Sequence, residues 1–204
     1  MNATLIRTNR RTLSVQIHPD KGLVIRAPRH LSESRIEKFL KEKESWIKKR
    51  LEQGEKQKSK IPKYSFTSGE HFLYLGALTL LPVHTRTKVI EWYKMKAKAH
   101  MNERTNELKQ ILAQKTKAKL PATTTKIRTY RSRWGTCSRD NVITYNWKII
   151  MAPSEIVDYL VSHELSHILH KNHGRRFYET LALLDPNYKA NQKWLRTNSS
   201  TLTI

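Results

Sequence analysis

The chain has 204 residues, a hydrophobic content of 38% and a formal net charge of +22 at pH 7. Its single cysteine, Cys137, excludes an internal disulfide and is typical of a reducing compartment. No run of about 18 apolar residues is present and the first residues lack the apolar core of a signal peptide, so the sequence predicts a cytoplasmic protein with no membrane partner.

The first part of the chain is predicted to mix strands with one helix. Apolar and polar residues alternate through residues 13–17, which predicts strands over residues 3–28 with a turn at 19–22. Ser32 then precedes apolar residues at helical spacing, which predicts one helix of about five turns. Residues 53–63 are polar and contain Gly and Pro, so they are predicted to form a loop.

The middle of the chain repeats this alternation of strand and helix. Residues 64–85 are predicted to form strands, and residues 89–113 have apolar side chains at helical spacing. Residues 126–147 are predicted to form a hairpin whose arms, 126–134 and 142–147, flank a turn at residues 135–141. The sequence therefore predicts an α+β fold whose N-terminal part, residues 1–85, consists of strands and one helix.

The remaining residues, 86–204, are predicted to form the functional domain. Pro153 opens a helix that is apolar on most sides, which is typical of a buried helix. A last helix is expected after Gly174. These elements would form a C-terminal domain around the motif described next.

A His-Glu-x-x-His motif spans His163 to His167. Helix positions four apart differ by about 40° around the axis, so His163 and His167 point the same way and can share one metal ion. Glu164 is turned away by about 100°, which keeps it off the metal but within reach of a metal-activated water. This is the zincin pattern, two imidazoles on zinc with a glutamate as the catalytic base. Residues 86–204 are therefore predicted to form a minimal zincin-like C-terminal metal domain.

His173 is the predicted third ligand. It cannot share an unbroken helix with the motif, because six residues beyond His167 correspond to a rotation of about 240°. Asn172 and Gly174 favour a helix end, and a turn there would bring His173 to the metal and leave a fourth position for water. Glu179 is an alternative third ligand, because some zincins use a carboxylate from the next helix. The prediction is one Zn²⁺ ion.

Positive charge is concentrated just before this motif. Residues 86–139 carry 15 basic and 3 acidic side chains, whereas residues 140–204 carry 7 and 6. Such a field attracts nucleic acid, nucleotides or acidic proteins. A lysine-rich surface that favours solubility gives the same composition.

Four passages resemble the YgjP-like family of metal-dependent hydrolases, whose metal domain is related to SprT and Wss-type zincins. They are Arg-Trp-Gly-Thr-Cys-Ser at 133–138, the Asn-to-Pro passage at 146–153, the motif helix at 158–167 and Asn-His-Gly-Arg-Arg-Phe-Tyr at 172–178. The resemblance implies that His163, His167 and His173 bind zinc and that Glu164 is the base. It also implies two activities, metallopeptidase and hydrolysis of UTP to the monophosphate and pyrophosphate.

Three functions follow as hypotheses. We rank a zinc metallopeptidase first, with an extended peptide substrate added to an edge strand of the 126–147 hairpin. A nucleotide pyrophosphatase is the first alternative, with Arg131 and Arg133 beside Trp134 as substrate-binding residues. The second is an SprT-like protease associated with nucleic acid through its basic surface. Tyr145 and Tyr178 are candidates for a transition-state donor.

Overall fold

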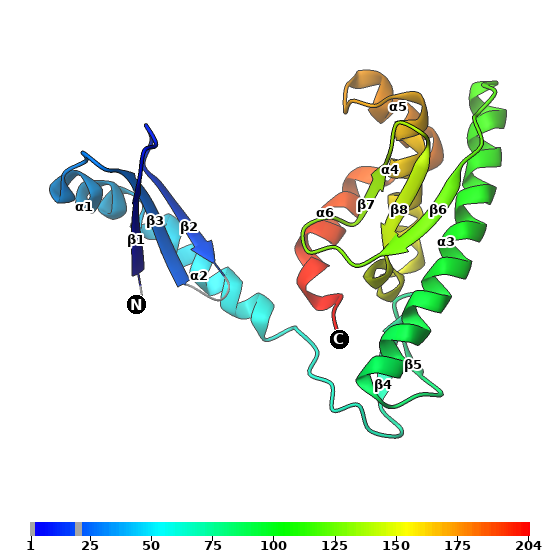
Figure 1. Cartoon of the computed structure of the whole chain (residues 1–204), viewed down its shortest axis with the longest axis horizontal. Coiled ribbons are helices and arrows are strands. Elements are labelled where there is room, and N and C mark those ends of the chain that lie inside the picture. The colour runs from blue at the N-terminus through cyan, green and yellow to red at the C-terminus, as the bar shows by residue number, and fades with distance from the viewer. Residues whose placement is uncertain (1–2, 19–21) are drawn as a thin grey trace. The chain divides into compact units, whose positions relative to one another are not determined.

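The computed structural model describes residues 3–18 and 22–204, which divide into two units, Met1–Lys60 and Ile61–Ile204 (Figure 1). Both units contain helices and strands, which confirms the predicted α+β class. Apart from Gly22, the turn predicted at 19–22 lies outside the described residues. Among those residues, no helix has both the length and the apolar character of a membrane span.

Unit 1 is a three-stranded sheet with two helices on one face. Strand β3 lies in the centre, parallel to β1 and antiparallel to β2. Alternate residues of β3 pack with apolar residues of the helices; this core contains Leu23, Ile25, Ala27, Ile36 and Ile47. The elements are β1 (Ala3–Thr8), β2 (Ser14–His18), β3 (Gly22–Pro28), α1 (Glu33–Glu42) and α2 (Glu44–Lys58).

The single helix predicted after Ser32 is divided into two at Lys43. An unbroken helix over residues 33–58 would be about 39 Å long. The seven-residue β3 extends only about 23 Å. A break at Lys43 lets Ile36 and Ile47, on either side of it, both reach the small sheet.

Unit 2 contains a hairpin, a second three-stranded sheet and four α-helices. Its hairpin strands are β4 (His71–Tyr74) and β5 (Ala77–Leu80), and its sheet strands are β6 (Thr124–Arg128), β7 (Gly135–Cys137) and β8 (Val142–Asn146). Its helices are α3 (Arg86–Thr116), η1 (Trp147–Met151), α4 (Ser154–Leu169), α5 (Arg175–Leu184), α6 (Tyr188–Asn198) and η2 (Ser199–Thr201).

The boundary between the units falls after Lys60, not after residue 85 as the sequence suggests. The β4–β5 hairpin packs on unit 2, because Leu75 N donates to Ile150 O at 2.8 Å and Phe72 is buried in the main core. The local strand pattern of residues 64–85 carries no information about which unit they join.

The hairpin predicted over residues 126–147 is wrong. The sheet order is β6-β8-β7, and β6 pairs with β8 in parallel. Residues 129–134 carry the chain back before β7 forms, so β7 alone is the antiparallel partner of β8. The edge strand nearest the motif helix is therefore the three-residue β7, which contacts α4.

Helix α4 is the buried centre of unit 2, as its apolar pattern predicts. Nine of its residues are buried, and among them Val157, Val161 and Leu165 are fully buried. Long α3 lies beside it and also runs alongside β6 (Figure 1). A bidentate ion pair joins the two helices, with Arg104 Nε and Nη2 each 2.8 Å from an oxygen of Asp158. The motif helix is thus held firmly in position.

Candidate metal centre

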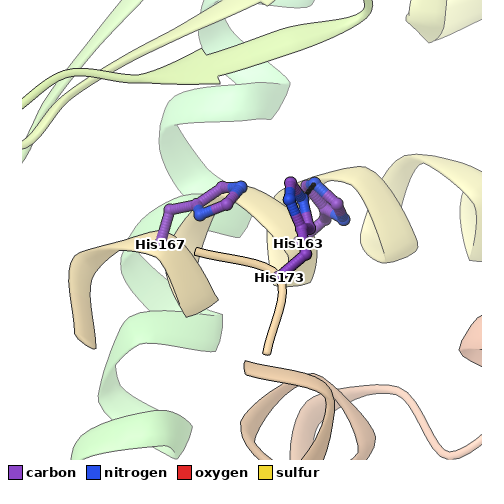
Figure 2. A group of neighbouring side chains, drawn as sticks. All are labelled: His163, His167 and His173. Atoms are coloured by element: carbon purple, nitrogen blue, oxygen red, sulfur yellow. Dashed lines mark hydrogen bonds between the residues drawn. The ribbon is translucent and has the colours of Figure 1, made fainter. Parts of the chain in front are cut away.

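Three histidines converge at the C-terminal end of α4 (Figure 2). His163 and His167 stand one turn apart on this helix. The helix ends at Leu169, so the predicted helix end before His173 is confirmed. The loop between α4 and α5 returns His173 toward the other two, and one ring nitrogen from each histidine lies within 4.8 Å of the others.

The spacing of these nitrogens fits a small tetrahedral cation. His163 Nε2 and His173 Nε2 lie 3.2 Å apart. Two nitrogens bound at about 2.0–2.1 Å to one tetrahedral zinc ion are separated by roughly 3.3 Å. The donor set, three imidazoles, suits a catalytic site that keeps a fourth position for water.

The backbone after α4 fixes the tautomer of His167. Nδ1 of His167 lies 3.1 Å from the carbonyl oxygen of His170, and a carbonyl can only accept a hydrogen bond. Nδ1 therefore carries the proton, which leaves the Nε2 lone pair for a metal. Because this contact uses a backbone atom of His170, no residue pattern in the sequence reveals it.

Burial keeps the histidines of α4 in their metal-binding form. It lowers the pKa of His163 to about 4, with smaller contributions from His167 and His173. It also lowers the pKa of His167. Neutral imidazole is the form that binds a metal, so these two side chains need lose no proton at pH 7.

Phe177 of α5 supports all three rings, and sequence reasoning assigns it only to the packed face of its helix. Its ring centroid lies 5.0 Å from that of His163 and 4.6 Å from those of His167 and His173. Phe177 is fully buried. It therefore holds the loop histidine against the two helical ones.

Replacing Phe177 with alanine is expected to lower both stability and affinity for zinc. The lost packing should cost about 3–5 kcal/mol of unfolding free energy, and the histidines lose their common support. Thermal unfolding and zinc competition with a chromophoric chelator measure the two effects. Leu181→Ala, one turn along the same buried face, is the control, because Leu181 belongs to the same core but has no aromatic ring to pack on the histidines. Equal zinc affinities in the two variants would contradict this role for Phe177.

Glu164 lies beside the cluster, buried at 3% exposure. Its Oε2 has no hydrogen-bond partner among the described residues, and burial raises its pKa to about 8. A bound divalent cation would favour the carboxylate form by stabilising its charge. With such a cation bound, the side chain would be a proton acceptor held out of bulk water.

Gly135 of β7 makes the space that Glu164 occupies. A Cβ atom at this position would lie 2.4 Å from Glu164 Oε1 and 2.8 Å from Cδ. Only glycine allows the strand to approach the carboxylate so closely. Sequence reasoning treats Gly135 as a turn residue; a glycine inside a strand is the signal that could have indicated close contact.

We expect Gly135→Ala to reduce catalytic turnover about 100-fold, because the added methyl group displaces Glu164 and misplacement of this order has that effect. Zinc content should not change. Gly174→Ala is a matched control, since a Cβ at Gly174 meets nothing within 4 Å. Measured kcat close to that of the wild type in Gly135→Ala would contradict the steric argument.

The predicted substrate residues lie on the segment that leads into β7. Arg131 and Arg133 are exposed on the loop before β7, and among the described residues neither side chain has an ion pair or hydrogen bond to the site. The Arg133 guanidinium lies over Tyr130, 5.8 Å from the ring centroid. Trp134 is half-buried against the main core. Asn146, which sequence reasoning did not single out, holds this loop by donating to the carbonyls of Tyr130 (3.1 Å) and Arg133 (3.3 Å).

The alternative ligand and the candidate donors also have defined places. Glu179 accepts a hydrogen bond from Arg175 Nε at 2.7 Å on the exposed side of α5 and lies outside the histidine cluster. Tyr178 lies beside the site, with its ring centroid 6.4 Å from that of His173. Tyr145 is fully buried, and its hydroxyl lies 3.0 Å from that of Thr105, so its position is structural.

Three converging imidazoles and an adjacent buried carboxylate define a metal centre of the type that metallohydrolases build on one helix. The model of the YgjP-like metallopeptidase domain matches residues 11–89 and 79–198. The chain therefore belongs to the YgjP-like family, which confirms the resemblance seen in the sequence.

A solved structure, the metallopeptidase zymogen of Pyrococcus abyssi abylysin, is similar to part of the chain. It is 19% identical, with a TM-score of 0.43, and the match covers 48% of this chain and 92% of that one. No curated protein matches the sequence.

Proposed function

We propose that this protein is a zinc-dependent metallopeptidase in which His163, His167 and His173 hold the metal and Glu164 is the catalytic base. The observation that carries the proposal is the contact between Glu164 and Gly135. It sets the buried carboxylate directly against edge strand β7, where an extended peptide can bind.

Strand β7 presents backbone groups for such a peptide. Trp134 O accepts a hydrogen bond from Asn146 N at 2.7 Å, and Ser138 N donates to Val142 O at 3.0 Å, so both residues direct these groups toward β8. Alternate residues of an antiparallel strand direct their backbone groups to opposite sides, so Gly135 and Cys137 direct theirs toward the open edge. A substrate that adds to this edge would pass beside Glu164.

Lys171 fixes β7 relative to the loop between α4 and α5 that carries His173. Its Nζ donates to Ser138 O at 3.1 Å and lies 3.5 Å from Asn141 Oδ1, both near the β7–β8 turn. Lys171 itself lies two residues before His173. One side chain therefore holds together strand β7, where the substrate is proposed to bind, and the loop of the proposed third ligand, His173.

The chain's own groups can carry out peptide hydrolysis. A bound zinc ion supplies Lewis-acid chemistry and makes a water molecule more acidic. Glu164 accepts a proton from water and later delivers it to the leaving amine. Burial of Glu164 keeps its proton transfer away from bulk solvent. Tyr178, beside His173, is the candidate donor to the developing oxyanion.

Hydrolysis of UTP is less well supported. A triphosphate at the histidine cluster needs cations directed at it. Arg131 and Arg133 are exposed on the loop before β7, and among the described residues neither side chain has a hydrogen bond or ion pair to the histidines or Glu164. The peptide hypothesis needs only the edge strand and Glu164.

The test is parallel incubation of zinc-loaded protein with an unfolded polypeptide, such as casein, and with UTP. We expect peptide fragments by mass spectrometry and no pyrophosphate above background. If the wild type released pyrophosphate but no fragments, and Glu164→Gln released no pyrophosphate, the peptidase assignment would be contradicted. The same centre would then be a nucleotide hydrolase.

A further inference from the structure

Unit 1 has a groove between α1 and the β-strand loops that the metal centre does not use. Its volume is about 540 Å³, within the range of binding sites for small ligands and short segments. It is lined by Arg11, Leu13, Pro28, Leu31, Arg35, Lys38, Phe39 and Glu42.

One face of α1 forms a wall of this groove. Arg35, Lys38, Phe39 and Glu42 have the i, i+3, i+4, i+7 spacing of a single helical stripe. Arg11, from the connection between β1 and β2, contributes a third cation. Among the residues the structure describes, none of these three cations has an ion-pair partner.

The floor of the groove is apolar. It is formed by Leu13, Pro28, Leu31 and Phe39. Phe39 is half-buried and does not belong to the core of unit 1, whereas its neighbour Leu40 packs against that core. An aromatic ring is therefore available beside three unpaired cations.

We infer that this groove binds an acidic polypeptide segment, with one apolar side chain on Phe39 and carboxylates on Arg11, Arg35 and Lys38. Charge complementarity selects an anionic partner. The mostly aliphatic floor suits a side chain, whereas nucleic-acid sites stack bases on several aromatic rings. Binding of this segment by the groove does not depend on the metal centre. That the groove would select acidic substrates for cleavage rests on the proposed peptidase function.

Binding is tested with the full-length Glu164→Gln protein, so that cleavage does not enter. The probe is a fluorescent peptide of alternating glutamate and leucine, measured by fluorescence anisotropy. Reversal of two groove cations, Arg35→Glu with Lys38→Glu, should weaken binding about tenfold. The control reverses Lys48 and Lys49, which are exposed on α2 and outside the groove. Equal weakening by both pairs would overturn the site, since it would mean that net charge alone attracts the peptide.

The apolar contact has its own test. Phe39→Ala should weaken binding of the glutamate–leucine peptide but not of a glutamate–alanine peptide. Circular dichroism of the same variant separates this effect from loss of the fold. Equal effects on both peptides would overturn the anchoring role of Phe39. A competing outcome is measured with oligothymidylate. If it bound more tightly than the peptide, and lost affinity in the Arg35→Glu, Lys38→Glu protein but not in the Lys48, Lys49 control, the groove would be a nucleic-acid site instead.

Discussion

Replacing Glu164 with glutamine is expected to reduce peptide hydrolysis by about 10²–10⁴-fold while zinc remains bound. The amide has the shape of the carboxylic acid but cannot accept a proton. Glu164 is not one of the converging metal donors, so metal content should stay the same. Because burial already favours the neutral form of Glu164, the neutral amide should cost little stability. Steady-state kinetics and metal analysis on the same preparations measure both effects.

Glu179→Gln is the matched control for this change. Glu179 lies on the exposed side of α5 and pairs with Arg175, outside the histidine cluster. Its replacement should leave kcat within about twofold of the wild type, as expected for a surface side chain. Full activity in Glu164→Gln, or equal losses in the two variants, would show that the base lies elsewhere.

Replacing His173 with alanine is expected to weaken zinc binding by at least about 100-fold, more than the loss of an outer-shell partner usually costs. The metal would retain only the two imidazoles of α4. His173 is exposed on the loop between α4 and α5, so the fold should remain intact. Competition with a chelator of known affinity measures the change.

His170→Ala is the control for this variant. The side chain of His170 is outside the cluster, and its contact with His167 uses the backbone carbonyl, which alanine keeps. Zinc affinity should therefore change little. If His173→Ala bound zinc as tightly as His170→Ala, the third ligand would have to be another residue, with Glu179 the first candidate.

The sequence predicts the grouping of the three histidines better than the fold around them. The positions of His163, His167 and Glu164 follow from helical periodicity, which is local. The return of His173 follows from the helix-stopping residues beside it, which are also local. The structure brings the three histidines together as this spacing predicts.

What the sequence could not predict depends on contacts between distant segments. The parallel pairing of β6 with β8 joins residues about 18 positions apart and leaves no local pattern. The same holds for the β4–β5 hairpin, whose strand character does not show that it packs on unit 2. Gly135 reads as a turn residue until Glu164 is seen to fill the space beside it.

The most direct test of the account is zinc K-edge X-ray absorption on the zinc-loaded protein. Three imidazole nitrogens at about 2.0–2.1 Å and one further light atom are predicted. The imidazole count should fall to two in His173→Ala and stay at three in His170→Ala. A sulfur shell at about 2.3 Å, or an unchanged imidazole count in His173→Ala, would contradict the three-histidine centre.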